Sequence, residues 1–246
     1  MFGAAVVAGA INTVAGGGTL LTFPTLIWLG MPSVMANATN TVAIWPGSLG
    51  SVWGYRRELV GVHPHVYALI IPSVIGGVAG AGLLRYTPTE VFDRLVPVLI
   101  FFATVVFMMQ EWFQRLFNRA RTEAHEGPKW VVEAMIFQLV VSVYGGYFGA
   151  GIGILMLAAL AIMGHTNIHQ MIALKNLLAV CINGVAAAYF VVSGLVSWPH
   201  VIVMAVGAIL GGVGSARVAR RLDQRTVRRT VIALGFAMAI SLMFRL

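Results

Sequence analysis

The sequence predicts an all-α integral membrane protein made of two inverted repeats, and three observations support this fold class. Of the 246 residues, 59% are hydrophobic and only 10% are charged, whereas soluble domains carry about 25% charged residues. The apolar stretches extend to about 20 residues, which is the length that a helix needs to span a bilayer. The second half of the chain also repeats the order of glycine, proline, asparagine and arginine residues found in the first half.

The net charge of +8 comes mostly from arginines, which cluster in short segments between the apolar stretches. Cytoplasmic loops of membrane proteins have this composition, so we do not expect a nucleic acid as a partner. The single cysteine, Cys181, excludes an internal disulfide. The first residues contain no basic segment, and we therefore do not expect a cleaved signal peptide.

The internal repeat is clearest between "LVGVHPHVYALIIPSVIGGVAGAGLLRYTP" and "LVSWPHVIVMAVGAILGGVGSARVARRLDQ". Pro64 aligns with Pro199 and Arg85 aligns with Arg220, in both cases with an offset of 135 residues. Matched glycine, proline and arginine residues in one order are harder to obtain by chance than matched apolar residues. The pattern therefore predicts a duplication.

Each half is expected to contain one apolar segment interrupted by glycines, followed by three continuous apolar segments. The first repeat, the polar linker and the second repeat are predicted at residues 1–112, 113–129 and 130–246. The segments of the first repeat, with the interrupted one first, are expected at residues 2–30, 35–53, 65–84 and 91–112. Those of the second repeat, in the same order, are expected at residues 131–164, 168–193, 199–217 and 226–244.

The distribution of positive charges predicts the topology. If each interrupted segment enters and leaves the membrane on one face as a re-entrant hairpin, twelve lysines and arginines lie on one face and three on the other. Positive charges concentrate in the cytoplasm, so this arrangement places the linker, residues 113–129, in the cytoplasm and both termini outside. Each repeat then crosses the membrane three times, which gives the two repeats opposite orientations, as in many secondary transporters.

The alternative is eight ordinary transmembrane helices, which divides the charges seven against eight and favours neither orientation. The arms of the first interrupted segment, residues 2–14 and 19–30, would each span about 18 Å as helix, less than the hydrocarbon core of about 30 Å. Thiol labelling of residues 30–34 and 164–167 separates the two arrangements. Hairpins place these loops on opposite faces, whereas eight crossings place them on one face.

The glycine motifs "AGGGT" and "YGGYFGAGIG" are predicted to reverse the chain inside the membrane. Glycine permits such a reversal because it has no side chain to clash, and irregular backbone at this depth needs protein or water around it. The half-helix after each motif would direct free N–H groups toward the protein centre, which favours an anion. The candidate ligands are Gly16, Gly17, Gly18, Thr19, Gly149, Gly151 and Gly153. The alternative role for these glycines is close helix packing.

Lys175 is the strongest single candidate for a substrate-binding residue, because it lies seven residues inside an apolar segment that starts at residue 168. Charge within a bilayer is costly and usually functional. No acidic residue lies within one helical turn of Lys175, so we expect its ammonium group to attract a sulfonate, a carboxylate or a similar anion. The alternative is that the side chain extends to the membrane interface.

Asparagine side chains in the apolar segments provide further candidates, since buried amides must find partners. Asn176 and Asn183 follow Lys175 in the same segment, and Asn40 is the counterpart of Asn176 in the first repeat. These three asparagines are expected to bind the substrate. Residues predicted to line the pathway are Asn12, Thr39 and Trp45.

Nothing in the sequence indicates an enzyme or a metal site. The motif "AGGGT" lacks the lysine and the serine or threonine of a phosphate-binding loop, and no set of nucleophile, base and acid is visible. The pairs His63 with His65 and His165 with His169 have no carboxylate or cysteine beside them, and zinc sites need such ligand sets. We expect no catalytic residue, no metal and no cofactor.

Two long stretches carry the glycine motif of the first half and the lysine-asparagine segment of the second. They are "INTVAGGGTLLTFPTLIWLGMPSVMANATNTVAIWPGSLGSVWGYRREL" and "ALKNLLAVCINGVAAAYFVVSGLVSWPHVIVMAVGAILGGVGSARVARRL". They resemble the two repeat signatures of the sulfite exporter TauE/SafE family, whose members are bacterial inner-membrane carriers associated with export of sulfite and organosulfonates. The resemblance implies a multi-pass protein of the bacterial inner membrane that exports a small sulfur-containing or related anion, driven by an ion gradient.

These features together predict a secondary transporter for a small anion, which alternates its access as one repeat moves against the other. The sequence does not determine the coupling ion, a proton or sodium, or the oligomeric state. One alternative is a passive anion channel, which would show no gradient-driven counterflow. Another is a non-catalytic subunit of a membrane complex, which would not transport when purified alone.

Overall fold

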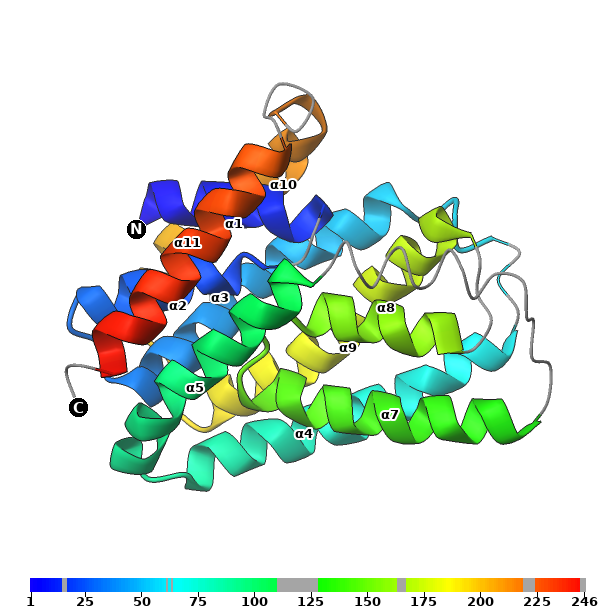
Figure 1. The fold of residues 1–246 in the computed structure, drawn as a ribbon, viewed down its shortest axis with the longest axis horizontal. Helices are drawn as coiled ribbons and strands as arrows, with labels where there is room; N and C mark the ends of the chain where they lie inside the picture. Colours follow the sequence, from blue (N-terminus) through cyan, green and yellow to red (C-terminus); the bar gives the residue numbers. More distant parts are fainter. Residues whose placement is uncertain are drawn as a thin grey trace.

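The computed structural model describes residues 1–14, 17–60, 62, 64–109, 128–162, 167–218 and 224–243, and every regular element in these ranges is helical (Figure 1). The elements before the linker are α1 (Phe2–Val14), α2 (Thr19–Trp28), α3 (Ser33–Gly54), the 3-10 helix η1 (Pro64–Leu69), α4 (Ile70–Tyr86) and α5 (Thr89–Met108). Those after it are α7 (Pro128–Tyr147), α8 (Ile152–Ile162), α9 (Ile168–Val192), α10 (Trp198–Val218) and α11 (Gln224–Met243).

The outer surface of the helix bundle is suited to lipid. Within the described ranges, three helical stretches are long and apolar enough to cross a membrane: Tyr67–Tyr86, Thr89–Met108 and His169–Val192. Many large apolar side chains, such as Val140 and Ile71, are exposed on the outside. Soluble proteins rarely expose so many. The protein is therefore an all-α, membrane-embedded protein, which confirms the predicted fold class at this level. The number of full crossings and the repeat organisation stay predictions.

Both glycine motifs interrupt a helix. The first break separates α1 from α2, and the second separates α7 from α8. At the second break, Gly149 and Gly151 have φ angles of +80° and +78°, a backbone conformation that residues with a side chain rarely adopt. This backbone turns the chain from α7 into α8 within four residues, from Phe148 to Gly151. Gly16, in the first motif, lies outside the described residues.

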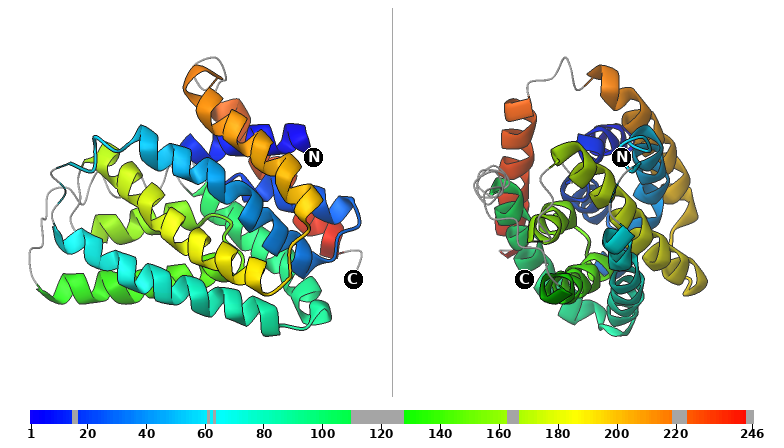
Figure 2. Two further views of the ribbon diagram at one scale, coloured as in Figure 1. Left: turned by 180° about the vertical axis from the view of Figure 1, so that it is seen from behind. Right: turned by 90° about the vertical axis from the view of Figure 1, so that its right-hand side faces the viewer.

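The two halves of the sequence are interlaced in space. Helix α1 packs along α10 and α3 packs on α10, while α7 packs along α4 and α9 packs on α4 (Figure 2). The first arm of each broken segment therefore lies against a helix from the other half of the chain. Glycines permit this close approach: a Cβ on Gly211 would overlap the carbonyl oxygen of Val6, and one on Gly80 would overlap that of Val143.

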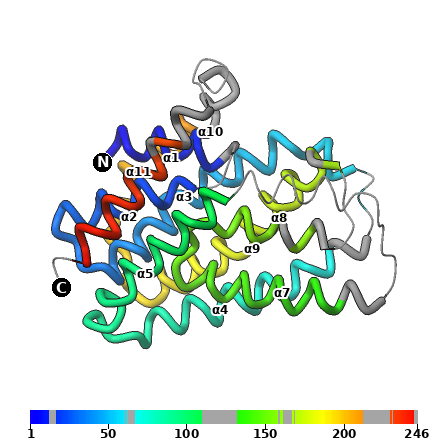
Figure 3. Tube along the Cα trace, viewed as in Figure 1, coloured from blue at the N-terminus to red at the C-terminus, as the bar shows by residue number. Residues whose placement is uncertain are grey.

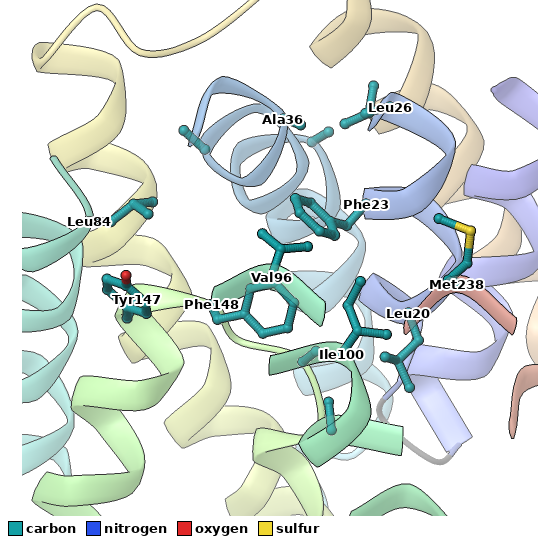
Figure 4. Packing of buried hydrophobic residues seen from close by; sticks show 14 of the residues in the cluster. Leu20, Phe23, Leu26, Ala36, Leu84, Val96, Ile100, Tyr147, Phe148 and Met238 are labelled. Carbon is teal, nitrogen blue, oxygen red and sulfur yellow. The ribbon is translucent and has the colours of Figure 1, made fainter. Parts of the chain in front are cut away.

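Aromatic packing in the core fixes the position of the second glycine motif. Phe148, only 2% exposed, lies beside Phe23 of α2 with ring centroids 5.3 Å apart in an edge-on arrangement. Figure 4 shows Phe148 facing Phe23 and Val96 in the middle of the apolar cluster. The Tyr144 hydroxyl donates a 2.8 Å hydrogen bond to the Ala150 carbonyl across the turn. These contacts hold the start of α8 at a defined place inside the bundle.

Replacing Gly211 with alanine is expected to destabilise the protein by about 1–3 kcal/mol, because the added methyl group forces α1 and α10 apart. Gly50→Ala is the matched control, since Gly50 is an exposed glycine of α3 with no atom near its Cβ position and alanine favours helix. The thermal unfolding midpoint of the purified protein in detergent measures both effects. A Gly211→Ala variant as stable as the wild type would contradict the close α1–α10 contact.

Candidate functional site

A small cavity lies where the two glycine breaks meet the middle of α3 and α9. It measures about 60 Å³, and since one water needs about 10–15 Å³ by this measure, it has room for a few waters or one compact solute. The residues around it that the sequence singles out are Asn12, Gly17, Thr19, Trp45, Gly149, Gly151, Gly153, Lys175, Asn176 and Asn183. Both halves of the chain therefore contribute to one site.

Lys175 supplies the charge of the cavity. Its side chain is 3% exposed, and no hydrogen bond or ion pair joins it to any other described residue. Helices α1, α2, α3 and α8 contain no Lys, Arg, Asp or Glu at all. The cavity thus places an ammonium group without a described partner deep inside the protein, where a negative partner would offset its lost hydration.

The N-terminus of α8 adds backbone donors to the same cavity. At the start of this helix, the Ile154 N–H donates a 3.1 Å hydrogen bond to the Gly151 carbonyl. Within the described chain, the N–H groups of Gly151, Ile152 and Gly153 donate to no other group, and all three residues line the cavity. A helix N-terminus with free N–H groups carries partial positive charge and binds anions.

The first glycine motif is arranged differently. The Asn12 side-chain oxygen accepts hydrogen bonds from the N–H groups of Gly17, at 3.1 Å, and Gly18, at 2.8 Å. Asn12 therefore caps the start of α2 from the preceding helix, as capping side chains do at many helix N-termini. Gly17 and Thr19 line the cavity and Gly18 does not. The two motifs were expected to be equivalent, but they differ in the number of backbone N–H groups that remain without an acceptor among the described residues.

The amide side chains divide into two groups. Asn176 and Asn183 line the cavity, and the buried Asn176 Nδ2 has no hydrogen-bond partner among the described residues. Asn40 is buried outside the cavity lining, and its Oδ1 is also without a described partner. Thr39 lies outside the lining too, because its Oγ1 accepts a 3.0 Å hydrogen bond from the Ser197 N–H. Thr39 thus links α3 to the segment that precedes α10.

Trp45 joins α3 to α9 at the edge of the cavity. Its Nε1 donates a 3.1 Å hydrogen bond to the Val180 carbonyl. The indole lies directly on Gly184, where a Cβ would come within 3.0 Å of Nε1. Trp45 therefore lines the cavity and also closes the seam between the two helices.

Several polar residues of α3 are missing from the sequence-based set of site residues. Thr41, Ser48 and Ser51 line the cavity, and Asn37 donates a 2.8 Å hydrogen bond from Nδ2 to the Tyr147 carbonyl just before the second break. The sequence pattern that could have identified them is the helical spacing of Thr41, Trp45 and Ser48, which places the three residues on one face of α3. Small hydroxyl residues in membrane helices usually bond to their own backbone, as Thr41 does to the Asn37 carbonyl at 3.0 Å.

No metal site emerges from the described side chains, since no three His, Cys, Asp or Glu residues among them come together. The chemistry available in the cavity is hydrogen-bond donation from N–H, hydroxyl, amide and ammonium groups. These groups fit a solute that carries acceptor oxygens and negative charge.

Comparison with known proteins identifies the family of the chain. Residues 1–242 match the family described as "Sulfite exporter TauE/SafE". The chain belongs to this family. It is 27% identical over 245 residues to the "Probable membrane transporter protein YfcA" of Escherichia coli (strain K12), with 99% of this chain and 88% of the relative covered. A "Probable membrane transporter protein" of Haemophilus influenzae is 27% identical over 250 residues, covering 99% of this chain and 93% of the relative. No solved structure matches the chain.

These findings confirm the resemblance to the TauE/SafE family that the two sequence signatures indicate. The names of the relatives also support a membrane transporter as the general function. Neither name specifies the solute carried. The roles of the individual cavity residues follow only from their geometry and chemistry.

Removing the Asn12 side chain is expected to loosen the first glycine motif. In Asn12→Ala, the Gly17 and Gly18 N–H groups lose their acceptor, at a cost of about 1 kcal/mol for a helix cap, which corresponds to roughly five-fold faster exchange. Amide hydrogen exchange of the peptide that contains residues 17–22 measures this. Asn183→Ala is the control, because it removes a cavity amide that makes no hydrogen bond to the described part of this motif. Unchanged exchange in Asn12→Ala would contradict the capping role.

Proposed function

We propose that the protein is a secondary transporter that exports a small anion, such as sulfite or an organosulfonate, across the bacterial inner membrane. The observation that carries this proposal is the unpaired Lys175 ammonium in a cavity that also receives the open N-terminus of α8. A membrane transporter of this family needs a solute site at mid-depth where irregular backbone lines a cavity. The cavity has the composition of such a site.

Each cavity group has a distinct task in this proposal. The Lys175 ammonium attracts the anion and offsets its charge, and the N–H groups of Gly151, Ile152 and Gly153 donate to its oxygens. The unpaired Asn176 Nδ2 supplies another donor, and Asn183 lies near the turn, with its Oδ1 3.8 Å from the Cβ position of Gly149. Charge-assisted hydrogen bonds of this kind are the strongest that a protein offers to an oxyanion.

The repeat and its topology are part of the same proposal. Helix α1 contacts α10 where Val6 meets Gly211, and α7 contacts α4 where the Leu139 carbonyl lies 2.8 Å from the Cβ position of Gly76. Val6 and Leu139 are 133 residues apart, and Gly76 and Gly211 are 135 apart, so the two interfaces correspond. In Figures 1 and 3, α1 runs from left to right and α7 from right to left. Both observations support two repeats of opposite orientation.

Under this topology, each broken segment is a re-entrant hairpin and each repeat adds three full crossings. The charge count of twelve against three places both termini outside and the linker, residues 113–129, in the cytoplasm. The first repeat is assigned to residues 1–112 and the second to residues 130–246. Eight ordinary crossings remain the competing arrangement.

The helix contacts support a particular way of alternating access. One group of packed helices comprises α1, α2, α3 and α10, and the other comprises α4, α7, α8 and α9. The two groups meet mainly where α3 packs on α9, beside the cavity, and this contact is as extensive as that of α9 with α4. We infer that these mixed groups move against each other, rather than one half of the sequence against the other half. The Trp45–Val180 hydrogen bond crosses the plane of this motion.

The gradient that drives export is one of protons or sodium. The cavity offers no carboxylate to carry either ion, since none occurs on α1, α2, α3, α8 or α9. A passive anion channel is the main alternative, and a subunit that works only within a larger membrane complex is another. Relatives named as transporters favour a carrier over an enzyme.

Uptake of labelled sulfite into liposomes that contain the purified protein tests the proposal. Lys175→Ala is expected to lower the rate about 10- to 100-fold, because a charged hydrogen bond contributes about 1.5–3 kcal/mol. The control is Arg94→Ala, which removes an exposed positive charge from α5. Wild-type rates in Lys175→Ala would show that the site lies elsewhere.

Counterflow in the same liposomes separates the alternatives. If the protein is a carrier, liposomes preloaded with unlabelled sulfite take up labelled sulfite faster than empty liposomes do. If it is a channel, preloading does not stimulate uptake. A subunit of a larger complex would give no uptake when it is purified alone.

A further inference from the structure

We infer that the cavity selects singly charged anions and excludes doubly charged anions of the same shape. This inference rests on the anion site proposed above and adds the charge of the solute to it. It follows from the number of fixed charges that face the cavity, from their distance to other charged groups and from the size of the space.

Among the described residues, one fixed charge, that of Lys175, faces the cavity. Of the helices that line the cavity, α1, α2, α3 and α8 carry no Lys, Arg, Asp or Glu, and α9 carries Lys175 alone. The other lining groups are backbone N–H groups, amides, hydroxyls, an indole and apolar side chains. These groups solvate the oxygens of an anion but do not neutralise a second full charge.

Other charged residues of the neighbouring helices lie far along their elements. Helix α7 reaches the cavity only through the turn that follows Tyr147, and its last charged residue, Glu133, is fourteen positions earlier, about 21 Å along a helix. In α5, Ala103 lies near Gly151, whereas Arg94 is nine positions earlier, about 13 Å away, and exposed. In α4, Arg85 is exposed and donates to the Ser193 carbonyl at 2.9 Å.

The first glycine motif does not compensate for the missing second charge. Its Gly17 and Gly18 N–H groups already donate to the neutral Asn12 amide. The N-terminus of α8 contributes a partial charge of about one half. A singly charged anion therefore finds its charge matched by Lys175, whereas a doubly charged anion keeps one charge buried without a partner, which low-dielectric surroundings penalise strongly.

The volume adds a second limit. A cavity of about 60 Å³ has room for one compact anion and leaves little room for the hydration shell of a doubly charged one. An anion that exists in singly and doubly charged forms, as sulfite does, is therefore bound as the singly charged form. The site is one for compact oxyanions with a net charge of minus one.

Methanesulfonate and sulfate provide the test, because both have a tetrahedral sulfur and the same number of non-hydrogen atoms but differ in charge. Isothermal titration of the purified full-length protein in detergent, at matched ionic strength, gives the two dissociation constants. We expect methanesulfonate to bind at least about ten-fold more tightly, which corresponds to about 1.4 kcal/mol. Lys175→Arg should retain this preference, and Lys175→Gln should weaken methanesulfonate binding by about ten-fold or more because the charge of the anion is then unmatched.

A second variant adds a positive charge to the cavity, so that the selectivity can be tested by a gain of sulfate binding rather than by a loss of binding. Ser48 lines the cavity, and Ser48→Lys is expected to shift the preference toward sulfate by about ten-fold or more relative to the neutral control Ser48→Gln. Size-exclusion profiles identify folded variants. Equal or tighter binding of sulfate by the wild type would overturn the charge selectivity and leave the anion site in place. Failure of both anions to bind would overturn the proposed site itself.

Discussion

A buried ammonium group with no counter-charge among the described residues is the constraint on which the rest of the structure depends. Lys175 is 3% exposed in a membrane-embedded bundle, and no described carboxylate offsets its charge. Such a group is stable only if polar atoms surround it or an anion joins it. The cavity between the glycine breaks provides hydrogen-bond donors and space beside this ammonium group, which is the basis for the anionic solute proposed above.

The break between α7 and α8 is the structural answer to the same constraint. A continuous helix would have used its N–H groups internally, so only an interrupted one directs the free N–H groups of residues 151–153 at the cavity. The left-handed backbone at Gly149 and Gly151 makes the turn. Phe148 and Tyr144 then fix it, the first by packing on Phe23 and the second by bonding to Ala150. The glycine backbone and the tertiary packing thus together hold the start of α8 at the cavity.

The interlaced packing explains how such a site could be rigid and mobile at once. Close glycine contacts, such as that of Gly211 with Val6, join helices from different halves into tight groups. Between α3 and α9, beside the cavity, Trp45 donates a hydrogen bond to the Val180 carbonyl. Small residues let helices approach within a membrane, so the tight groups follow from sequence patterns that look like simple glycine enrichment.

The sequence predicts the parts of this protein that depend on local chemistry. Runs of apolar residues give the helices, glycine clusters give the breaks, and a lone lysine in an apolar segment identifies the charged centre. The tertiary pairing of α1 with α10 and of α4 with α7 was not predictable in this way, because apolar helices carry little information about which neighbour they choose.

The same limit applies within the site. Asn40 and Asn176 occupy matching positions in the sequence, yet only Asn176 faces the cavity. Asn12 was expected to line the pathway and lies at the cavity, but its use as a cap for Gly17 and Gly18 depends on the fold of the turn. Ser48 and Thr41 were missed because hydroxyl residues in membrane helices are common and often bond only to their own backbone. The direction of the side chain, rather than the residue type, determines which of these residues face the cavity.

The most direct measurement of the central claim is the position of a bound heavy-atom anion. Selenite has the shape of sulfite, and its selenium scatters anomalously, so crystals of the protein grown with selenite locate it without assumption. The account predicts one anomalous peak within hydrogen-bonding reach of the Lys175 ammonium and of the N–H groups at residues 151–153. A peak at another site, with Lys175 instead paired to a carboxylate of the chain, would contradict it.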